Sequence, residues 1–440
     1  MSFPRYPKYK PSGVEWLGDV PEGWEVKPLK FVATYNDDVI DETTPPETEI
    51  LYVDISAVDA LDGIKMKEPM AFSAAPSRAR RRVKHGDTII STVRTYLRAI
   101  ARVRTPEENL IVSTGFAVIR PRADLSPDYV GNVVSASYFI EQVIARSTGV
   151  GYPAINASDL ARIPVAIPPL PEQTAIAEFL DRDTGKIDGL VAEQRRLMEL
   201  LKEKRQAVIA HAVTKGINPH APMKPSGIEW LGDVPAHWKI PRLGYCAKIE
   251  NGTTPSRANP EYWSGGEIPW LSSGEVNQQR ISEATEFITQ KALDECSLRM
   301  LPKGTIVTGM IGQGKTRGLA ASLEIEATIN QNLAAIIPGK NLKSDYLLFI
   351  FQAVYEYLRE FGRGGNQAAL NCELLSTLKI PLPSSEEQLG ICDCLRKRLR
   401  EFDSLTTEAQ RAIDLLQERR TALISAAVTG QIDVRQPTRN

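Results

Sequence analysis

Residues 11–29, PSGVEWLGDVPEGWEVKPL, return at residues 225–243 as PSGIEWLGDVPAHWKIPRL, with 12 of 19 positions identical. A second pair of similar segments lies downstream, where PPLPEQTAIAEFLDRDTGKIDGL begins at Pro168 and PSSEEQLGICDCLRKRLREFDSL begins at Pro383. The two copies close with AVTKGI at Ala212 and AVTGQI at Ala427. Self-similarity at a fixed period indicates a repeated structural unit. We therefore interpret the chain as two copies of one unit, each a variable segment followed by a helical segment.

The helical segments carry apolar residues at a seven-residue spacing, which is typical of a coiled-coil seam. Their flanks, such as AEQRRLMELLKEKRQ and TEAQRAIDLLQERR, consist of charged residues that favour helices. Two equivalent seams in one chain predict that the helices pair with each other as an antiparallel bar, rather than each standing alone in solvent. The residues predicted to pair are Ile187, Leu190, Leu197, Leu201 and Val208 in the first helix, and Phe402, Leu405, Leu416 and Leu423 in the second.

The variable segments predict strands. GDTIISTV (86–93) and GTIVTGMI (304–311) are β-branched runs that begin at a glycine, and GFAVIRP and LAAIIP follow about 25 residues later in both copies. The fold class is therefore α+β, with two strand-rich mixed domains separated by two long antiparallel helices and a pseudo-twofold internal repeat. The predicted boundaries are 1–165 and 225–382 for the domains, 166–214 and 383–430 for the helices, 215–224 for a linker and 431–440 for a tail. Because the joint after the second helix copies the joint after the first, the N-terminal repeat should lie beside the C-terminal helix.

Composition restricts the possible functions. The chain has 440 residues, 53 Lys and Arg against 54 Asp and Glu, and a formal net charge of -1, so a nucleic-acid surface would have to be a local patch. A run of 18 apolar residues is absent and the start, MSFPRYPKYK, lacks an apolar signal core, so we expect a cytoplasmic protein without a membrane span. Five cysteines without a paired framework fit a reducing compartment. Cys392 and Cys394 form C-x-C without a second pair, so we expect no metal site.

One motif suggests a different class of protein. GMIGQGKT (309–316) matches the phosphate-loop pattern G-x-x-x-x-G-K-[ST], which needs a strand before it and a helix after it. The sequence that follows predicts strands, and the equivalent stretch of the first copy, STVRTYLR (91–98), has neither glycine nor lysine. We therefore expect no bound nucleotide and no cofactor. A nucleotide hydrolase acting through Lys315 remains an alternative, as does a coiled-coil adaptor without DNA affinity.

Several motifs resemble one known family. GVEWLGDVPEGW at 13–24 and GIEWLGDVPAHW at 227–238 open the two halves, NGTTPSRANPEYWSGGEIPWLSSGEV begins at Asn251, and GRGGNQAALNCELLSTLKIPLPSSEEQ begins at Gly362. With these, nearly the whole chain resembles the DNA specificity subunit of type I restriction-modification systems. The resemblance implies a non-catalytic subunit with two target-recognition domains, each reading one half of a split DNA target. The paired helices would hold the domains apart and dock two methylation subunits, and restriction subunits would complete the complex. The first half lacks the TPSxxNPEYW element, so contact residues transfer poorly between the halves.

The candidate DNA contacts are basic or polar residues in loops and in one dense run. Phosphate contacts position a protein on DNA, whereas contacts to base edges specify the sequence. The run RARRRVK is predicted to clamp phosphates, although such a run can also be a plain solvated surface. Gln313 could read adenine and Arg317 guanine. The full set is Arg78, Arg80, Arg81, Arg82, Lys84, Arg94, Tyr96, Arg98 and Tyr152 in the first half, and Gln313, Lys315, Arg317, Arg363, Asn366 and Gln367 in the second. Because the two domains diverge in sequence, the target should be bipartite and asymmetric.

Overall fold

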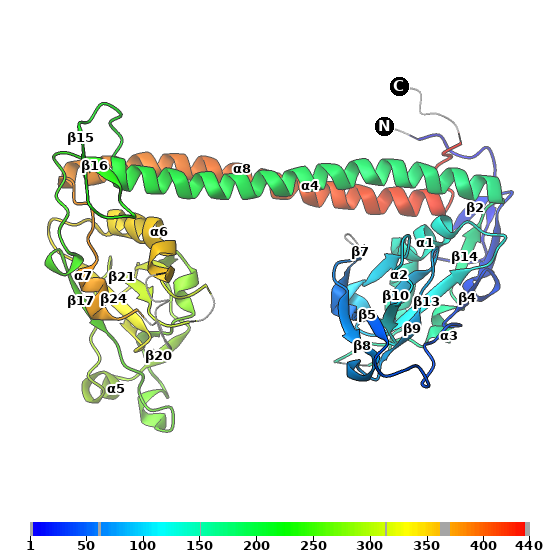
Figure 1. Ribbon diagram of the computed structural model, residues 1–440, viewed down its shortest axis with the longest axis horizontal. Helices are drawn as coiled ribbons and strands as arrows, with labels where there is room; N and C mark the ends of the chain where they lie inside the picture. The colour runs from blue at the N-terminus through cyan, green and yellow to red at the C-terminus, as the bar shows by residue number, and fades with distance from the viewer. Residues whose placement is uncertain (1–2, 60–62, 150, 313–314, 361–369, 436–440) are drawn as a thin grey trace. The chain divides into compact units, whose positions relative to one another are not determined.

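The computed structural model describes residues 3–59, 63–149, 151–312, 315–360 and 370–435. The chain divides into two compact units, one made of Met1–Arg195 with Gln410–Asn440 and the other of Arg196–Ala409. Each unit contains one strand-rich domain and one segment of each long helix (Figure 1). The predicted α+β class and duplicated organisation are confirmed.

The two long helices are α4, Leu170–Lys215, and α8, Ser385–Val428, which we call the spacer helices. In the first unit Arg420 donates from Nε to Asp188 Oδ1 at 2.8 Å. In the second unit Arg205 donates from Nη1 to Asp403 Oδ1 at 2.5 Å. These two pairs occupy equivalent positions of the repeat, with the arginine and the aspartate exchanged between the helices. Within each unit the pairing is antiparallel, as the sequence predicts.

The packing seam of the spacer helices differs in part from the predicted row. Ile187 and Leu201 are buried, and Val208, Phe402, Leu416 and Leu423 are partly buried. Leu190, Leu197 and Leu405, however, are exposed, so the pairing role predicted for these three is wrong. A straight α-helix drifts by about 20° per heptad against a strict seven-residue row, so the row leaves the contact face along a long helix. The buried seam positions that the prediction missed include Val191, Ile209, Ala409, Ile413 and Ile424.

The domain of the first unit contains two four-stranded sheets. The first sheet has the order β11-β10-β13-β4 and the second β8-β5-β12-β9. Their bounds are β4 Ala33–Tyr35, β10 Thr88–Ser91, β11 Ile100–Arg102 and β13 Phe116–Pro121, then β5 Glu49–Val53, β8 Glu68–Ala71, β9 Ala79–Arg82 and β12 Leu110–Ser113. Smaller elements are β1 Tyr9–Pro11 with β2 Asp19–Pro21, β3 Glu25–Pro28 with β14 Pro164–Ile167, β6 Val58–Asp59 with β7 Gly63–Ile64, and helix α3 Ala157–Leu160.

Two short helices, α1 Pro127–Ser135 and α2 Ser137–Arg146, lie between the first sheet and the spacer helices (Figure 1). Their buried side chains form one core with Ile90 and Ile119 of the sheet, Leu180 of α4 and Ile424 of α8. The other face of the sheet packs on the second sheet through a separate core that includes Phe116 and Val112. The spacer helices, the two short helices, the first sheet and the second sheet therefore pack on one another in this order.

The second unit repeats this plan with a different sequence. Its main sheet has the order β17-β24-β21-β22-β19, whose first four strands correspond to β4, β13, β10 and β11, and its second sheet has the order β20-β18-β23. One long helix, α6 Ser344–Glu360, takes the place of α1 and α2. The remaining bounds are β17 Ala247–Asn251, β18 Ile268–Leu271, β19 Arg280–Ile281, β20 Glu286–Ile288, β21 Ile306–Gly309, β22 Ala320–Leu323, β23 Thr328–Ile329, β24 Leu333–Pro338, β15 Met223–Pro225 with β16 Asp233–Pro235, α5 Gln290–Glu295 and α7 Cys372–Thr377.

The repeat that opens each half forms its junction with the spacer helices. Trp24 is buried and donates from Nε1 to Glu172 of α4 at 3.0 Å, and Trp238 makes the same bond to Glu387 of α8 at 3.0 Å. At the end of α8, Gly430 adopts φ +74, and a Cβ there would meet Pro21 Cδ at 2.3 Å. The N-terminal repeat thus packs against the C-terminal end of α8, as the duplicated joint predicts.

The phosphate-loop match lies in a setting that differs from a nucleotide site. Gly309 ends strand β21, and the element that follows Thr316 is strand β22, which pairs antiparallel with β21. The described residues between them, 310–312 and 315–319, contain no helix that could present amide groups to a phosphate. The motif is therefore part of a hairpin connection.

Candidate nucleic-acid interface

The loop that follows β10 presents three of the predicted DNA contacts. A single 3₁₀ turn, Thr95–Leu97, is flanked by Arg94 and Arg98, both with left-handed backbone at φ 50 and φ 52. Such a conformation is uncommon for residues other than glycine and must be held by its surroundings. The backbone N–H of Arg94 donates to the carbonyl of Pro153 at 2.8 Å, and the Thr95 hydroxyl bonds that of Ser147 at 2.8 Å. The turn is therefore fixed to the segment that carries Tyr152.

Arg94 and Tyr152 come together although 58 positions separate them in the sequence. The Arg94 guanidinium lies 4.8 Å from the centroid of the Tyr152 ring, and both side chains are exposed, the tyrosine by 67 %. Tyr96 is exposed nearby on the same turn. A guanidinium stacked on an aromatic face keeps its N–H edge directed outward, where it can donate to a phosphate or a base edge. This cluster is the strongest candidate contact of the first unit.

Arg98 faces a different environment. It lines a cleft of about 980 Å³ within the first unit, whose walls also carry Asp59, Glu141, Asp414 and Glu418. Carboxylates so placed repel a phosphate backbone, so this cleft favours a cationic neighbour over DNA. The base-reading role of Arg98 stays a prediction, and the geometry supports it less than it supports Arg94.

The basic run forms β9, at one edge of the second sheet. At its ends the cations have carboxylate neighbours: Arg78 lies 2.8 Å from Asp54, and Lys84 lies 2.6 Å from Asp38. Although burial alone would raise the pKa of Asp54, hydrogen bonds from Tyr52 and from the backbone of Ser56 outweigh it and lower that pKa. A phosphate at this edge would share these cations with the carboxylates of Asp54 and Asp38.

The arginines at the centre of the run have different surroundings. Arg80 stacks over Phe72 at 5.3 Å from the ring centroid, and Arg82 is exposed. Arg81 is partly buried, its Nε has no hydrogen-bond partner among the residues that the structure describes, and burial lowers the pKa of its guanidinium. The run is therefore not a uniform phosphate clamp, because one arginine is stacked on a ring, one is partly buried and one is exposed.

In the second unit the corresponding loop is tied to the end of α6. Tyr355 donates from its hydroxyl to the carbonyl of Lys315 at 2.7 Å, and the Arg317 guanidinium donates to the carbonyl of Arg359. The Lys315 side chain is exposed, whereas Arg317 is partly buried. Four other predicted contacts, Gln313, Arg363, Asn366 and Gln367, lie outside the described residues.

One candidate residue was missed. Arg257 is exposed and stacks 3.8 Å from the centroid of Trp263 and 5.1 Å from that of Trp270, while it pairs with Glu286 at 2.5 Å. This is a stacked-arginine arrangement like that of Arg94 in the first unit. The sequence contains both residues in the motif TPSRANPEYW, but their spacing of six residues does not predict that Arg257 stacks on Trp263.

Within the described part of the chain, histidine, cysteine and carboxylate side chains form no group of three or more that could hold a metal ion. The same residues include no helix long and apolar enough to cross a bilayer.

Comparison with known proteins identifies the repeated unit. The family model of the type I restriction modification DNA specificity domain matches residues 21–190 and 235–414. The specificity subunit of type I restriction enzyme MjaIX from Methanocaldococcus jannaschii is 32 % identical over 193 residues, which cover 43 % of each chain. The EcoR124I/EcoR124II specificity subunit from Escherichia coli is 26 % identical over 58 % of this chain and 60 % of its own length. A putative MjaX specificity subunit from M. jannaschii is 24 % identical over 95 % of this chain and 96 % of its own.

Solved structures show the same fold. A chain from a structure concerned with assembly and conformational transition of the type I R-M system superposes with a TM-score of 0.71 at 24 % identity, covering 93 % of this chain and 98 % of that one. The HsdS subunit from Thermoanaerobacter tengcongensis superposes with a TM-score of 0.50 at 24 % identity, covering 94 % and 98 %. With its two matched repeats, the chain belongs to the family of type I restriction-modification DNA specificity subunits.

Proposed function

We propose that this chain is the subunit that reads DNA sequence for a type I restriction-modification complex in the cytoplasm. One recognition domain would read each half of a bipartite, asymmetric target, and the catalytic steps would belong to partner subunits. The observation that carries the proposal is that the family model matches once in each half, and that each half has its own sheets and its own core. Because the two domains differ in sequence and in their exposed stacked arginines, Arg94 and Arg257, they should read different bases.

Duplex binding separates this proposal from its alternatives. A DNA reader should bind duplex with an affinity that falls steeply as salt rises, because phosphate contacts release counterions. A coiled-coil adaptor should not bind duplex at low salt. A nucleotide hydrolase should bind ATP in a calorimetric titration and lose that binding in Lys315→Ala, whereas we expect no ATP binding in either protein.

Arg94→Ala is expected to weaken reading of one half-site only. If the stacked guanidinium contacts a base, its loss should cost about 1–3 kcal/mol on the half-site read by the first domain. The measurement is competition binding with duplexes altered in either half-site. Arg182→Ala is the matched control, since Arg182 also stacks on an aromatic ring, that of Phe179, but lies on α4. Equal weakening for both half-sites, or an equal effect of the control, would contradict the assignment.

The spacer helices offer equivalent apolar surfaces for partner subunits. Leu190 of α4 is 54 % exposed and Leu405, its counterpart in α8, is 47 % exposed. Leu200 and Leu415 form a second exposed pair at equivalent positions. Leucines that are not buried within the chain at matched positions of both helices suit two copies of one partner. We therefore propose that these surfaces dock two methylation subunits, to which restriction subunits would bind.

Leu190→Glu is expected to weaken binding of one methylation subunit by at least about tenfold, or roughly 1.4 kcal/mol. Because the position is exposed, the free energy of unfolding should change by no more than about 0.5 kcal/mol. The measurement is the stoichiometry of the purified complex as the methylation subunit is titrated. Leu170→Glu is the control, because Leu170 is similarly exposed on α4 but its counterpart in α8 is Ser385. Full binding of two methylation subunits to Leu190→Glu would rule out this surface.

A further inference from the structure

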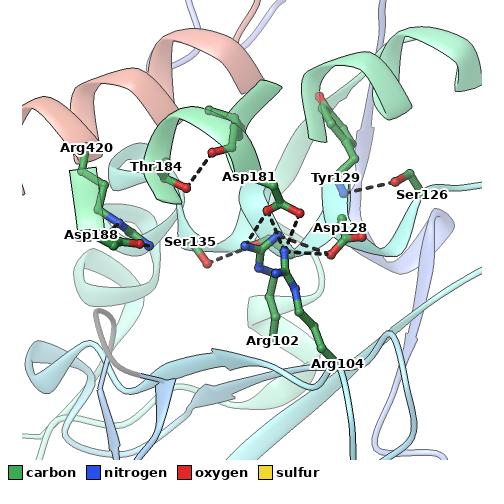
Figure 2. A network of polar contacts seen from close by, with 12 residues as sticks. Arg102, Arg104, Ser126, Asp128, Tyr129, Ser135, Asp181, Thr184, Asp188 and Arg420 are labelled. Carbon is green, nitrogen blue, oxygen red and sulfur yellow. Dashed lines mark hydrogen bonds and ion pairs between the residues drawn. The ribbon is translucent and has the colours of Figure 1, made fainter. Parts of the chain in front are cut away.

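A network of arginines and aspartates joins the first recognition domain to spacer helix α4. Arg102, at the end of β11, lies 3.0 Å from Asp181 of α4 and 3.4 Å from Asp128 of α1. Arg104 lies 2.6 Å from Asp181 and 3.5 Å from Asp128. Figure 2 shows both guanidinium groups between the two carboxylates. The domain therefore presents positive charge to a negative residue of its spacer helix.

The second half joins the equivalent elements with two charges reversed, at the spacer helix and after the strand, while Asp345 of α6 keeps the charge of Asp128 of α1. Arg396 of α8 bonds Asp345, the first-turn aspartate of α6. Arg280 bonds the other oxygen of Asp345 at 2.6 Å and also bonds Glu324, which follows β22. Here a carboxylate of the domain, Asp345, pairs with a positive residue of the spacer helix, and Arg280 of the same domain joins Asp345 to Glu324.

The reversal falls on equivalent positions. Asp181 and Arg396 are equivalent because PPLPEQTAIAEFLD, from Pro168, aligns with PSSEEQLGICDCLR, from Pro383. Arg104 and Glu324 are equivalent because strand register places Arg102 opposite Thr88, and Ser322 opposite Ile306, in matching hairpins.

Two further contacts between domain and spacer helix recur in both halves. Gln173 of α4 accepts a bond from the backbone of Ser126 at 2.9 Å, and Gln388 of α8 accepts one from the backbone of Lys343 at 2.8 Å. Tyr129 of α1 and its counterpart in α6 each donate to a carbonyl of the segment before their spacer helix, Tyr129 at 2.9 Å. These recurring bonds would accept either domain on either helix, whereas the charged contacts would not.

We propose that the residue at 181 or 396 acts as a charge code that restricts each spacer helix to the recognition domain of its own half. The surface of α4 around Asp181 fits a domain that presents arginines, and the surface of α8 around Arg396 fits a domain that presents carboxylates. Matched pairs between half-exposed groups stabilise little. The code acts when a domain is placed on the wrong spacer helix. Groups of like charge would then occupy positions that lie about 3 Å apart in the matched pairing, and their repulsion would destabilise the unit.

The side chain of Arg102 cannot easily turn away from α4. A Cβ added at Gly131 of α1 would lie 2.4 Å from Cδ of Arg102, so the stem of Arg102 lies close against the helix backbone. In the second half the equivalent pair is Leu348 and Ser322, so the bulk lies on the helix and the small residue on the strand. The position of Arg102 is therefore built into the first domain, and would travel with it if the domain were moved to α8.

The test is whether the effect of one substitution on the melting temperature changes sign when the recognition domain is exchanged. In the parent chain, Asp181→Arg should lower the melting temperature of the first unit by about 2–4 °C, which corresponds to about 1 kcal/mol in a unit of this size. In a full-length chimaera whose residues 33–163 are replaced by residues 247–378, the same substitution should raise that melting temperature. Calorimetry without DNA is the measurement, so failure of DNA reading would not affect the outcome.

Asp183→Arg is the matched control, because its counterpart is also an arginine, Arg398, but Asp183 pairs with Arg182 and Lys186 of its own helix. It should shift parent and chimaera in the same direction. A shift of the same sign for Asp181→Arg in both proteins would overturn the proposal.

A second pair of variants keeps the idea testable if the chimaera does not fold. In the parent chain, Arg104→Glu should lower the melting temperature, and Arg104→Glu combined with Asp181→Arg should recover at least half of the summed loss. The combined variant reproduces the charges of Glu324 and Arg396. If the two losses simply added, the charges would not be coupled and the code would be refuted.

Discussion

Trp24→Ala should destabilise the first unit by about 3–5 kcal/mol, the range for removing a large aromatic side chain from a packed core. Trp24 is 1 % exposed, its ring lies at 5.8 Å from that of Tyr6 in an edge-to-face arrangement, and its Nε1 donates to Glu172. Removing the indole leaves a cavity and takes one donor from a buried carboxylate. Because whole domains are stable by only about 5–15 kcal/mol, a large part of the stability of the unit would be lost.

Denaturant unfolding, with hydrogen exchange to locate the loss, is the measurement for Trp24→Ala. Protection should fall in the first unit far more than in the second, and Trp238→Ala should give the reciprocal pattern. Trp16→Ala is the control within the same repeat, since Trp16 is 36 % exposed and stacks with Arg146 at the surface. Similar losses for Trp16→Ala and Trp24→Ala would show that the repeat does not anchor the unit through its second tryptophan.

Insertion of one heptad into each spacer helix should change the DNA sequence that is recognised. Seven residues keep a heptad seam in register and lengthen each helix by roughly 10 Å. If the helices set the separation of the half-sites, the unspecified stretch between them should grow by about 3 base pairs, at about 3.4 Å per base pair. Both half-sites should stay the same, because neither recognition domain is altered.

The motif methylated by the lengthened protein, together with its methylation subunit, decides this prediction. A protein with the heptad inserted into α4 alone is the control, because its helices would be out of register and should methylate poorly. An unchanged spacing in the doubly lengthened protein would show that the helices do not act as the ruler.

Sequence reasoning predicted the parts of this fold that depend on pattern. The repeat at 11–29 and 225–243 predicted two units, and glycine-bounded β-branched runs predicted β10 and β21 at the centres of equivalent sheets. The hairpin after Gly309 was also predicted, because the first copy lacks the glycine and lysine of the motif. Periodicity could not place the whole helix seam, because drift over a helix as long as α4 turned Leu190 and Leu197 to solvent.

Side-chain contacts between distant segments could not be predicted in this way. The sequence predicted Arg94 and Tyr152 as DNA contacts in separate loops. The structure shows that they stack because a hydrogen bond between the backbones of Arg94 and Pro153 brings the two loops together. Arg257 was overlooked because its tryptophan partners are six and thirteen residues away, and nothing local reveals that they surround it. The reversal of charge between the halves also depends on strand register, which sequence comparison does not provide where the domains diverge.

The most direct test of the central claim is to sequence the methylated DNA of a host that carries this chain with its methylation subunit, beside a host in which the gene for this chain is deleted. The account predicts one motif that depends on this chain, made of two different half-sites separated by a stretch of unspecified bases. A continuous motif, two identical half-sites, or methylation that persists without the chain would contradict it.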